Sequence, residues 1–337
     1  MTTQAAFTLS PDTAVAYLRD RGLLADGSAD ATSLGGGVSN RVVRVRTDER
    51  TLVLKQPLAN LAVEDDWPAD VVRVHNEATA ARAYATVIDA AGLNDVRVPD
   101  VLFEDEREHV VGFECIPDAT MWKRELLGGH VELEIARSLG RFLGTAHRHM
   151  SGDDDLREQF ADKTPFEQLR VTPYHRTTAE RHPEVADEIR LEIERVLGVD
   201  RVLVHGDYSP KNVLVADGVL WLLDFEVAHW GDPAFDTAFM LNHLFIKSIH
   251  IEARQSACID AALAFWQAYC TASGWEIERA TIRELAVLLL ARVDGKSPVE
   301  YIDAETGEIL RIVAIRALCE DVTTLRGFTD LIWEVTA

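Results

Sequence analysis

The chain has 337 residues, of which 47% are hydrophobic and 27% charged, a balance that excludes intrinsic disorder, collagen and coiled coil. Asp and Glu number 56 against 34 Lys and Arg, so the net charge is −22 and the basic face that nucleic-acid binding needs is not expected. No apolar run approaches the roughly 20 residues of a membrane span, and the four cysteines form no CxxC pair, so we expect a cytoplasmic protein without a membrane segment, disulfide framework or zinc site.

The first third of the chain predicts a small antiparallel sheet and one long helix. Residues 41–46 and 51–55 are β-prone runs joined by a polar turn, and residues 98–103 and 109–113 form a second such pair. Alanine and apolar residues at helical spacing predict a helix over residues 74–91. This part of the sequence therefore predicts an α+β lobe.

The remainder is expected to be mainly helical, with one β-rich island over residues 202–224. The predicted helices cover residues 131–150, 184–197, 234–249, 256–272, 281–293 and 308–328. We therefore predict two domains, an N-terminal lobe over residues 1–115 and a C-terminal lobe over residues 116–337, which join near residues 114–118.

The β-rich island carries the most specific motif of the chain. Asp207 follows His-Gly after an apolar strand, Asn212 comes five residues later, and Asp224 ends the next apolar strand. Phosphoryl transfer needs a carboxylate that orients the attacking hydroxyl and accepts its proton, and oxygen ligands that hold Mg²⁺ on the phosphates. Asp207 suits the first task, and Asn212 and Asp224 suit the second. A polar hairpin between two strands is the alternative interpretation, and it accounts for less of this spacing.

The segment resembles the catalytic loop of the aminoglycoside phosphotransferase and choline kinase superfamily, whose members carry His-Gly-Asp there. Residues 232–236 are similar to the Asp-Pro-x-x-Asp continuation of that superfamily, whose acidic residues brace the loop, so Asp236 is expected to be structural. The resemblance implies a protein-kinase-like, two-lobed α+β fold, with a small antiparallel-sheet N-lobe and a larger, mainly helical C-lobe. It also implies that ATP binds between the lobes and that Mg²⁺ assists transfer of its γ-phosphoryl group to a hydroxyl of a small metabolite.

The resemblance further implies a phosphate-covering loop and an anchoring lysine in the N-terminal lobe. The run at residues 34–40 suits such a loop because glycines let backbone N–H groups approach phosphates closely, although a simple turn before a strand is the alternative. Its candidate nucleotide contacts are Gly36, Gly37, Ser39 and Asn40. Lys55 resembles the kinase lysine and Glu77 is expected to pair with it, unless Glu77 only favours the start of its helix. Backbone groups near Glu114 and Ile116 are expected to bind the nucleotide base.

A narrower likeness is to the methylthioribose kinases. The matching positions in the first lobe are Lys55-Gln56, Trp67-Pro68, Arg73 and Glu77. The sequence Asp224-Phe225-Glu226 has the Asp-x-Glu form of those enzymes, which implies that Glu226 joins Asp224 at the metal. The catalytic loop departs from them, since it continues Tyr-Ser-Pro-Lys-Asn rather than Leu-His-Thr-Gly, and their paired arginines near the C-terminus are not found.

Acceptor contacts are expected from a polar cluster that interrupts a helical pattern near residues 291–301. Its candidates are Arg292, Asp294 and Lys296, and the segment just past the join adds Trp122 and Lys123. The two cations of the cluster suit an anionic group of the acceptor. The alternatives are a helix end followed by a loop for the cluster, and simple packing for Trp122 and Lys123.

Two further functions remain open on these residues. An aminoglycoside-inactivating phosphotransferase would need an acidic acceptor site, and the basic residues Arg292 and Lys296 disfavour this function. A non-catalytic nucleotide-binding pseudokinase is disfavoured because every residue that the chemistry needs is present. The sequence does not specify the acceptor, the choice between ATP and GTP, or whether the protein is a monomer or a homodimer.

The composition also bears on the source of the protein. Only six of the 34 basic residues are lysine, and carboxylates are in large excess. A carboxylate-rich, lysine-poor surface keeps a protein hydrated where salt screens charge repulsion. The composition therefore indicates a halophilic protein or, alternatively, an ordinary acidic protein from a GC-rich genome in which arginine replaces lysine.

Overall fold

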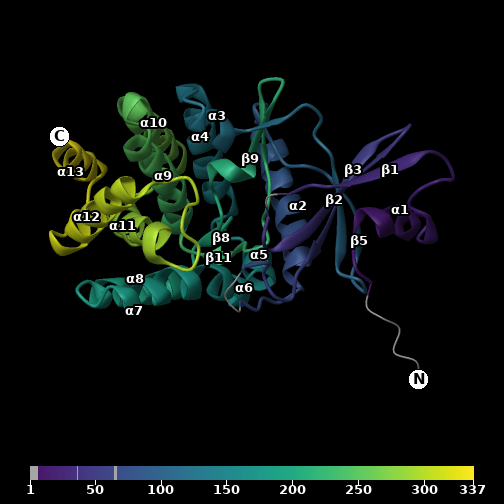
Figure 1. Cartoon of the computed structure of the whole chain (residues 1–337), viewed down its shortest axis with the longest axis horizontal. Helices are drawn as coiled ribbons and strands as arrows, with labels where there is room; N and C mark the ends of the chain where they lie inside the picture. Colours follow the sequence, from purple (N-terminus) through teal and green to yellow (C-terminus); the bar gives the residue numbers. More distant parts are fainter. Residues whose placement is uncertain (1–6, 36, 64–66) are drawn as a thin grey trace. The chain divides into compact units, whose positions relative to one another are not determined.

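The computed structural model describes residues 7–35, 37–63 and 67–337. The chain divides into two units, the first made of Met1–Ala85 and Val98–Asp118 and the second of Thr86–Arg97 and Ala119–Ala337. Residues 86–97 therefore belong to the second unit, although they lie between two segments of the first. They comprise the end of a long helix and the short strand that follows it. Each unit is described by itself below, with the elements labelled as in Figure 1.

The first unit is built on a five-stranded antiparallel sheet with strand order β1-β2-β3-β6-β5. The strands are β1 (Ala29–Ser33), β2 (Asn40–Thr47), β3 (Thr51–Pro57), β5 (Val101–Asp105) and β6 (Val110–Glu114). Helix α1 (Pro11–Asp20) packs against β2 and β3 through buried residues that include Leu18 and Leu54. Helix α2 (Arg73–Ala91) begins in this unit, and its first turns pack on Val111 and Phe113 of β6.

The strand register decides which face of the sheet carries Lys55. Lys55 lies directly opposite Val111, so the two side chains are on the same face. Val111 packs against Val74 and Ala78 of α2, whereas Leu54, next to Lys55, packs in the cluster that contains α1. The alternation of a strand therefore turns Lys55 toward α2 and away from α1.

The second unit is mainly helical. Its helices are α3 (Trp122–Leu127), α4 (Leu133–Met150), α5 (Asp154–Gln159), α6 (Thr164–Phe166), the π-helix η1 (Glu167–Arg176), α7 (Thr177–Arg181), α8 (Ala186–Gly198), the 3₁₀ helices η2 (Pro210–Asn212) and η3 (Glu252–Arg254), α9 (Pro233–His250), α10 (Gln255–Ser273), α11 (Glu278–Asp294), α12 (Ala304–Cys319) and α13 (Leu325–Thr336). Its strands are β4 (Val96–Arg97), β7 (Thr120–Met121), β8 (Val202–Val204), β9 (Val213–Ala216), β10 (Val219–Leu222) and β11 (His229–Gly231). They form a sheet of order β4-β10-β9-β7 and the antiparallel pair β11-β8.

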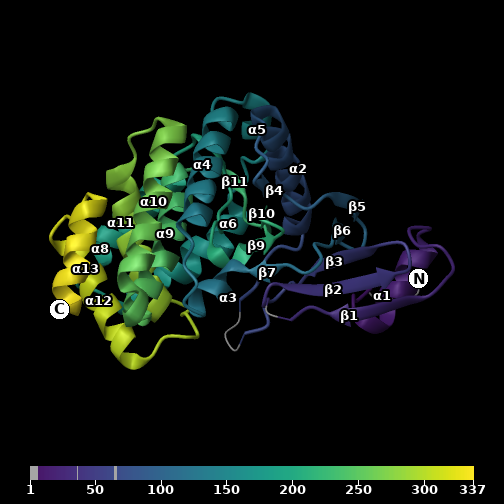
Figure 2. The ribbon, with the colours of Figure 1, turned by 90° about the horizontal axis from the view of Figure 1, so that it is seen from above.

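Helix α9 lies in the middle of this unit, where α10, α11 and α12 all pack against it (Figure 2). Helices α4 and α10 approach each other unusually closely. A Cβ added at Gly140 or Gly144 of α4 would lie 2.1 Å from the Phe265 carbonyl oxygen or 2.6 Å from that of Tyr269, both in α10. The two glycines are therefore required by the close packing of α4 against α10.

The predicted α+β class is confirmed, with a small antiparallel sheet in the first unit and a mainly helical remainder. The prediction of one helix over residues 308–328 is wrong, because the chain breaks between α12 and α13 and the Thr324 side chain caps α13 by accepting from Gly327 N at 3.1 Å. Helix α1, strand β1 and the short helices from α5 to α7 were not predicted.

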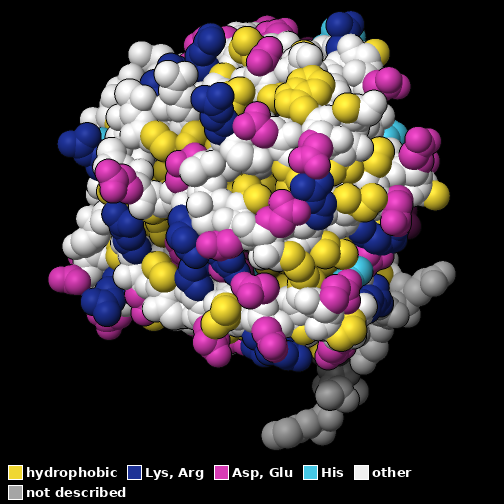
Figure 3. All heavy atoms as spheres, turned by 90° about the vertical axis from the view of Figure 1, so that its left-hand side faces the viewer, with side chains coloured by type: hydrophobic (Ala, Val, Ile, Leu, Met, Phe, Trp, Pro, Cys, Tyr) yellow, Lys and Arg dark blue, Asp and Glu magenta, His cyan; other side chains and the backbone are white. Residues whose placement is uncertain are grey.

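Two surface properties complete the description. Among the residues that the structure describes, no helix has both the length and the hydropathy that crossing a bilayer requires. On the face shown in Figure 3, acidic and basic side chains are interspersed, so the excess of carboxylates does not form a single acidic field there.

Candidate active site

In the first unit, Lys55 and Glu77 form a short ion pair. The Lys55 Nζ atom donates to Glu77 Oε1 at 2.6 Å, and the Glu77 side chain is only 3% exposed. The pair joins strand β3 to helix α2 on the face of the sheet described above. A buried carboxylate of this kind fixes the position of the ammonium group, as in kinases.

The segment before β2 is held by backbone contacts. The Ser39 carbonyl oxygen accepts from Leu58 N at 2.8 Å and from Arg73 Nη2 at 2.6 Å. The Asn40 side-chain amide donates from Nδ2 to Ser39 Oγ at 3.0 Å. A Cβ at Gly37 would meet no atom within 4 Å, so packing among the described residues does not require glycine there. Gly36 lies outside the described residues.

The two residues predicted to contact the nucleotide base lie at the end of β6 and just beyond it. Glu114 is the last residue of β6, where its backbone N–H donates to the Asp100 carbonyl oxygen at 2.9 Å. Ile116 follows two residues later, and both residues are partly exposed.

In the second unit, Asp236 at the start of α9 holds the His-Gly-Asp loop. Its carboxylate accepts from His205 N at 2.7 Å and from Gly206 N at 2.8 Å, and His147 Nε2 lies 3.3 Å away. Gly206 has φ +75°, and a Cβ there would lie 2.6 Å from the Val227 carbonyl oxygen, so only glycine fits. The loop that carries Asp207 is thus held in place through its backbone N–H groups, which donate to Asp236.

Asp207 is 1% exposed and makes ion pairs through one of its two oxygens. Its Oδ2 atom lies 2.9 Å from Arg170 Nη2 and 2.9 Å from Lys211 Nζ. Its Oδ1 atom is buried and has no hydrogen-bond partner among the described residues. A buried acceptor without a partner costs free energy, so this oxygen is placed for a donor that the chain does not supply.

The electrostatics of this site are dominated by carboxylates that surround Arg170. Burial alone would lower the pKa of the Arg170 guanidinium, but the charges of Asp207, Glu226 and Asp224 raise that pKa above its ordinary value. The three carboxylates therefore all lie near Arg170, although residue 170 precedes them in a separate helix. Burial also lowers the pKa of His205, whose Nε2 lies 3.1 Å from the Leu223 carbonyl oxygen.

The predicted metal ligands are held in the same region. The Asn212 side chain donates from Nδ2 to the Asp207 carbonyl oxygen at 2.9 Å, which leaves its amide oxygen as the group able to bind a cation. Asp224 has φ +70°, a left-handed conformation that is strained for a non-glycine residue and is common at functional sites. Glu226 is buried.

These oxygens fit Mg²⁺ in kind, since a hard cation prefers carboxylate and amide oxygens. The described residues contain no group of three or more His, Cys, Asp or Glu side chains arranged around a metal position. Mg²⁺ usually takes one or two protein carboxylates together with substrate phosphates and waters.

The five predicted acceptor residues have different surroundings. Asp294 is held by Arg311 at 2.7 Å and by His182 at 2.9 Å, so its carboxylate is already paired. Trp122 is completely buried in α3, which packs against η2 of the catalytic loop. Lys123 forms an ion pair with Glu300.

The other two predicted acceptor residues lie in and after α11. Arg292 is 9% exposed and has no carboxylate partner among the described residues. Lys296 is partly exposed, and its backbone N–H donates to the Pro173 carbonyl oxygen at 2.9 Å.

Two residues of this site, Arg170 and Ser209, were not predicted from the sequence. Arg170 was missed because its contact with Asp207 joins two segments far apart in the chain, and no local pattern signals it. Ser209 is part of the motif itself, and its hydroxyl is buried without a hydrogen-bond partner among the described residues. A polar residue between two motif residues was the signal that could have identified it.

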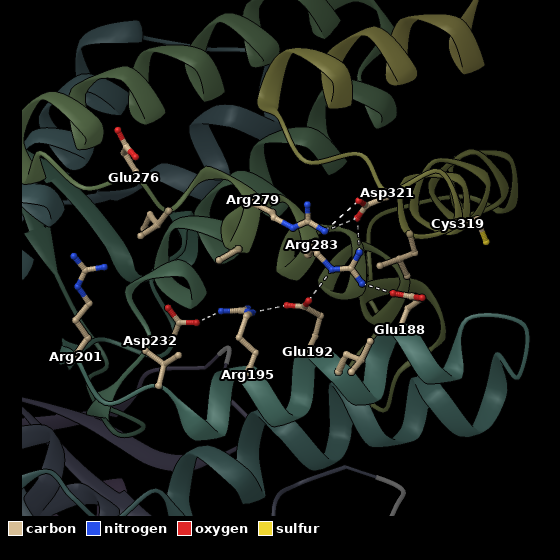
Figure 4. A pocket seen from close by; sticks show the side chains of 15 residues that line it. Glu188, Glu192, Arg195, Arg201, Asp232, Glu276, Arg279, Arg283, Cys319 and Asp321 are labelled. Atoms are coloured by element: carbon tan, nitrogen blue, oxygen red, sulfur yellow. Dashed lines mark hydrogen bonds and ion pairs between the residues drawn. The ribbon is translucent and has the colours of Figure 1, made fainter.

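A separate groove of about 730 Å³ lies among α8, α11 and the end of α12 (Figure 4). Its basic side chains are largely neutralised by neighbouring carboxylates. Arg195 pairs with Glu192 at 2.6 Å and with Asp232, and Arg283 pairs with Glu192 at 2.9 Å and with Asp321 at 2.9 Å. No residue of the catalytic loop lines this groove, so we do not assign the chemistry to it.

Comparison with known proteins identifies the family. The model of the phosphotransferase enzyme family matches residues 30–285, which include both Lys55 and the catalytic loop. The chain belongs to this family. It is an enzyme of the phosphotransferase class with an alcohol group as acceptor, and the superfamily predicted from the His-Gly-Asp segment is confirmed.

Proteins similar to this chain include methylthioribose kinases. That of Bacillus cereus is 23% identical over 283 residues, which cover 75% of this chain and 70% of the relative. That of Yersinia pseudotuberculosis is 27% identical over 274 residues, which cover 71% of this chain but only 65%, just under two thirds, of the relative. Among solved structures, an amicoumacin kinase in complex with AMP-PNP, Ca²⁺ and Ami is 14% identical, with a TM-score of 0.55 and coverage of 94% of this chain and 96% of that chain. This likeness shows the fold alone, which is kinase-like. The family and the methylthioribose kinase relatives support a small-molecule kinase.

Proposed function

We propose that the protein transfers the γ-phosphoryl group of Mg·ATP to a hydroxyl of a small metabolite, with Asp207 as the residue that orients the hydroxyl and accepts its proton. The observation that carries the proposal is the buried Asp207 Oδ1 atom, which has no hydrogen-bond partner among the described residues. The other oxygen is held by Arg170 and Lys211, each at 2.9 Å. One carboxylate oxygen is therefore anchored while the other is available to a hydroxyl donor.

The nucleotide is assigned to residues of both units. In the first unit, Lys55, fixed by Glu77, contacts the phosphates; the segment with Gly37, Ser39 and Asn40 covers them, and the backbone near Glu114 and Ile116 binds the base. A bound Mg²⁺ would neutralise charge on the transferring phosphoryl group. In the second unit, Asn212, Asp224 and Glu226 would hold that ion, since their oxygens are of the kind it prefers.

Catalysis would then come mainly from positioning. Asp236 fixes the backbone of His205 and Gly206, which fixes Asp207 one residue later. Holding the hydroxyl and the phosphoryl group in line replaces an entropically costly encounter with a nearly unimolecular step. Because the donor is ATP, we also propose that the reaction takes place in the cytoplasm.

Methylthioribose is one candidate acceptor. It is supported by the relatives at 23% and 27% identity and by the Asp-x-Glu form of residues 224–226. An aminoglycoside is the second candidate that the fold allows. Aminoglycosides are cationic, however, and Arg292, one of the predicted acceptor residues, has no carboxylate partner among the described residues. Its positive charge therefore disfavours a cationic acceptor. A pseudokinase role would leave the buried Asp207 oxygen without purpose.

The test is a pair of substitutions, one expected to impair turnover and the other expected to impair Mg·ATP binding. Asp207→Asn should lower acceptor-dependent ADP release by about 100-fold or more while leaving Mg·ATP affinity nearly unchanged. Asp224→Ala should instead weaken Mg·ATP binding, measured by titration calorimetry. Asp217→Asn is the matched control, because Asp217 is an exposed turn residue between β9 and β10 of the same segment. Wild-type turnover by Asp207→Asn would show that Asp207 is not the base.

A further inference from the structure

Two basic side chains in the second unit are buried and have no carboxylate partner among the described residues. Lys247 of α9 is 0% exposed, and its Nζ atom donates to the His243 carbonyl oxygen at 3.2 Å and to Tyr301 Oη at 3.3 Å. Arg292 of α11 is 9% exposed and donates from Nη1 to Tyr174 Oη at 3.3 Å and to the Ser297 backbone and hydroxyl oxygens. Among the described residues, neither Lys247 nor Arg292 lies within ion-pair distance of an acidic group.

Both side chains also keep donors that no described residue accepts. The Arg292 Nε atom is buried and has no hydrogen-bond partner among the described residues. The Lys247 ammonium has three donors but only two acceptors among the described residues. Buried charges in proteins are normally paired, because an unpaired one loses its hydration without compensation. The missing partner of these two cations is therefore expected to be a ligand.

The electrostatics agree with this geometry. The pKa of Lys247 is lowered to about 7, first by burial and then by the charge of Lys123, with a smaller contribution from Arg292. Burial, followed by Lys247, Arg292 and further lysines, holds the pKa of His243 well below its usual range, so this ring stays neutral. An anion placed here would relieve the mutual repulsion of the cations.

Tyr301 joins the exposed and buried parts of this cluster. The Nζ atoms of Lys123 and Lys247 each lie 5.3 Å from the centroid of its ring. Lys123 is partly exposed and is paired with Glu300, which lies at the surface. The cluster therefore extends from the surface, through the partly exposed Tyr301, to the buried Lys247.

A short chain of contacts connects the cluster to the catalytic carboxylate. Asp207 pairs with Arg170, whose guanidinium lies 5.7 Å from the ring centroid of Tyr174. The guanidinium of Arg292 lies 5.6 Å from the same ring and donates to its hydroxyl. Tyr174 is thus held between the arginine of the catalytic site and the arginine of the cluster, and the two guanidiniums outweigh burial and lower its pKa.

We propose that Lys247, Arg292 and Tyr301 form a subsite that binds an anionic oxygen group of the acceptor, a carboxylate or a phosphate, beside Asp207. The inference rests on the proposed kinase function and narrows it, because it selects hydroxy acids or phosphorylated hydroxy compounds over neutral and cationic acceptors. The terminal phosphate of ATP is the competing occupant, and the kinetic test distinguishes it.

The first experiment needs no knowledge of the acceptor. The protein is labelled with ¹³C at the ε-carbons of its six lysines, and the pKa of Lys247 is followed by NMR with and without acetate or inorganic phosphate. Bound anion should raise that pKa by about one unit, which corresponds to tenfold tighter anion binding to the charged lysine. A Lys247 titration that neither anion changes, even at saturating concentration, would overturn the inference.

The second experiment compares acceptors that share a carbon skeleton. Glycerol, D-glycerate and glycerol 3-phosphate are compared as a neutral, a carboxylate and a phosphate acceptor, and methylthioribose, ribonate and ribose 5-phosphate form a five-carbon set. An anionic member should be preferred in kcat/KM, and Lys247→Met should raise its KM by about 10- to 100-fold, the range expected for a lost hydrogen bond to a charged group. The KM for ATP should stay within about twofold of its original value.

The control variant is Lys163→Met. Lys163 is also a largely buried lysine, but it pairs with Asp200 at 2.7 Å and donates to two backbone carbonyls, so its loss should leave the acceptor KM unchanged. Phosphorylation of a neutral acceptor with equal efficiency by wild type and Lys247→Met would overturn the inference and leave the kinase function intact. A raised KM for ATP in place of the acceptor would assign the cluster to the nucleotide. Anion binding at Lys247 without ADP release from any acceptor would overturn the proposed function itself and, with it, the acceptor role.

Discussion

Replacing Asp236 by asparagine tests whether one buried carboxylate holds the catalytic loop. Its two oxygens accept from His205 N at 2.7 Å and from Gly206 N at 2.8 Å, and the residue is 0% exposed. Asparagine has almost the same shape but offers one oxygen and one NH₂ group. One of the two backbone N–H groups would therefore face another donor.

The magnitude follows from these two contacts. Loss of a hydrogen bond to a charged acceptor costs about 1.5–3 kcal/mol, and a buried N–H left without an acceptor costs about 1–3 kcal/mol. The sum, about 2.5–6 kcal/mol, is a large part of the roughly 5–15 kcal/mol that holds a typical domain together. Because the same backbone leads into Asp207, a looser loop should also lower kcat more than it raises the KM for ATP.

The assay is urea unfolding of wild type and Asp236→Asn, followed by steady-state kinetics where the variant is folded. Asp303→Asn is the control, since Asp303 caps α12 by accepting from Thr306 N at 2.8 Å, and asparagine caps helices about as well as aspartate. Unchanged stability together with unchanged turnover in Asp236→Asn would refute the role given to this carboxylate.

Three further predictions follow from the same structure. Gly206→Ala should lower stability by about 1–3 kcal/mol and reduce turnover, measured by thermal unfolding and ADP release, because φ is +75° and the new Cβ would lie 2.6 Å from the Val227 carbonyl oxygen. His229 is buried, and its burial lowers its pKa from 6.5 to about 4. The unfolded chain therefore takes up a proton at this ring first, so the stability is fully present above pH 6.5 and falls by about 3 kcal/mol toward pH 4. His229→Gln should reduce this pH dependence, measured by urea titrations at several pH values. The KM for an anionic acceptor should rise by about tenfold in total between pH 7 and pH 9, because the empty enzyme loses the Lys247 proton near pH 7 and the anion raises that pKa by about one unit, and Lys247→Met should abolish this dependence in initial-rate measurements. The titratable and charged groups that face Lys247 are Lys123, Cys258, Arg292, Glu300, Tyr301 and His243.

The sequence predicted those parts of the fold that neighbouring residues encode. Strands β2 and β3 have β-prone runs around a polar turn, and α2 ends as predicted before Gly92, whose φ is +64°. The break between α12 and α13 was missed because good helix formers stand on both sides of it. The signal was present in Thr324, which caps the second helix.

In the second unit, the candidate site was predictable where one motif carries it. Asp207, Asn212 and Asp224 lie within a single β-rich segment, and their spacing points to the chemistry. Arg170 reaches Asp207 from a π-helix that contains a proline, so neither periodicity nor propensity marks its position. Lys247 lies in a helix that is almost completely buried, and its lack of an acidic partner among the described residues appears only when α3, α10 and α11 are folded around it.

The scarcity of lysine gives these positions added weight. Arginine supplies most of the positive charge, yet four of the six lysines, at positions 55, 123, 211 and 247, belong to the candidate site or its cluster. A guanidinium remains charged in proteins and needs room for a planar fork, whereas an ammonium is a compact charge that can lose its proton when buried. A buried side chain with a pKa near 7 and two short contacts therefore requires lysine. A composition that favours arginine elsewhere thus leaves lysine where its particular chemistry is needed. This connects the acidic, arginine-rich sequence to the proposed acceptor site, which would become fully charged only when an anion binds.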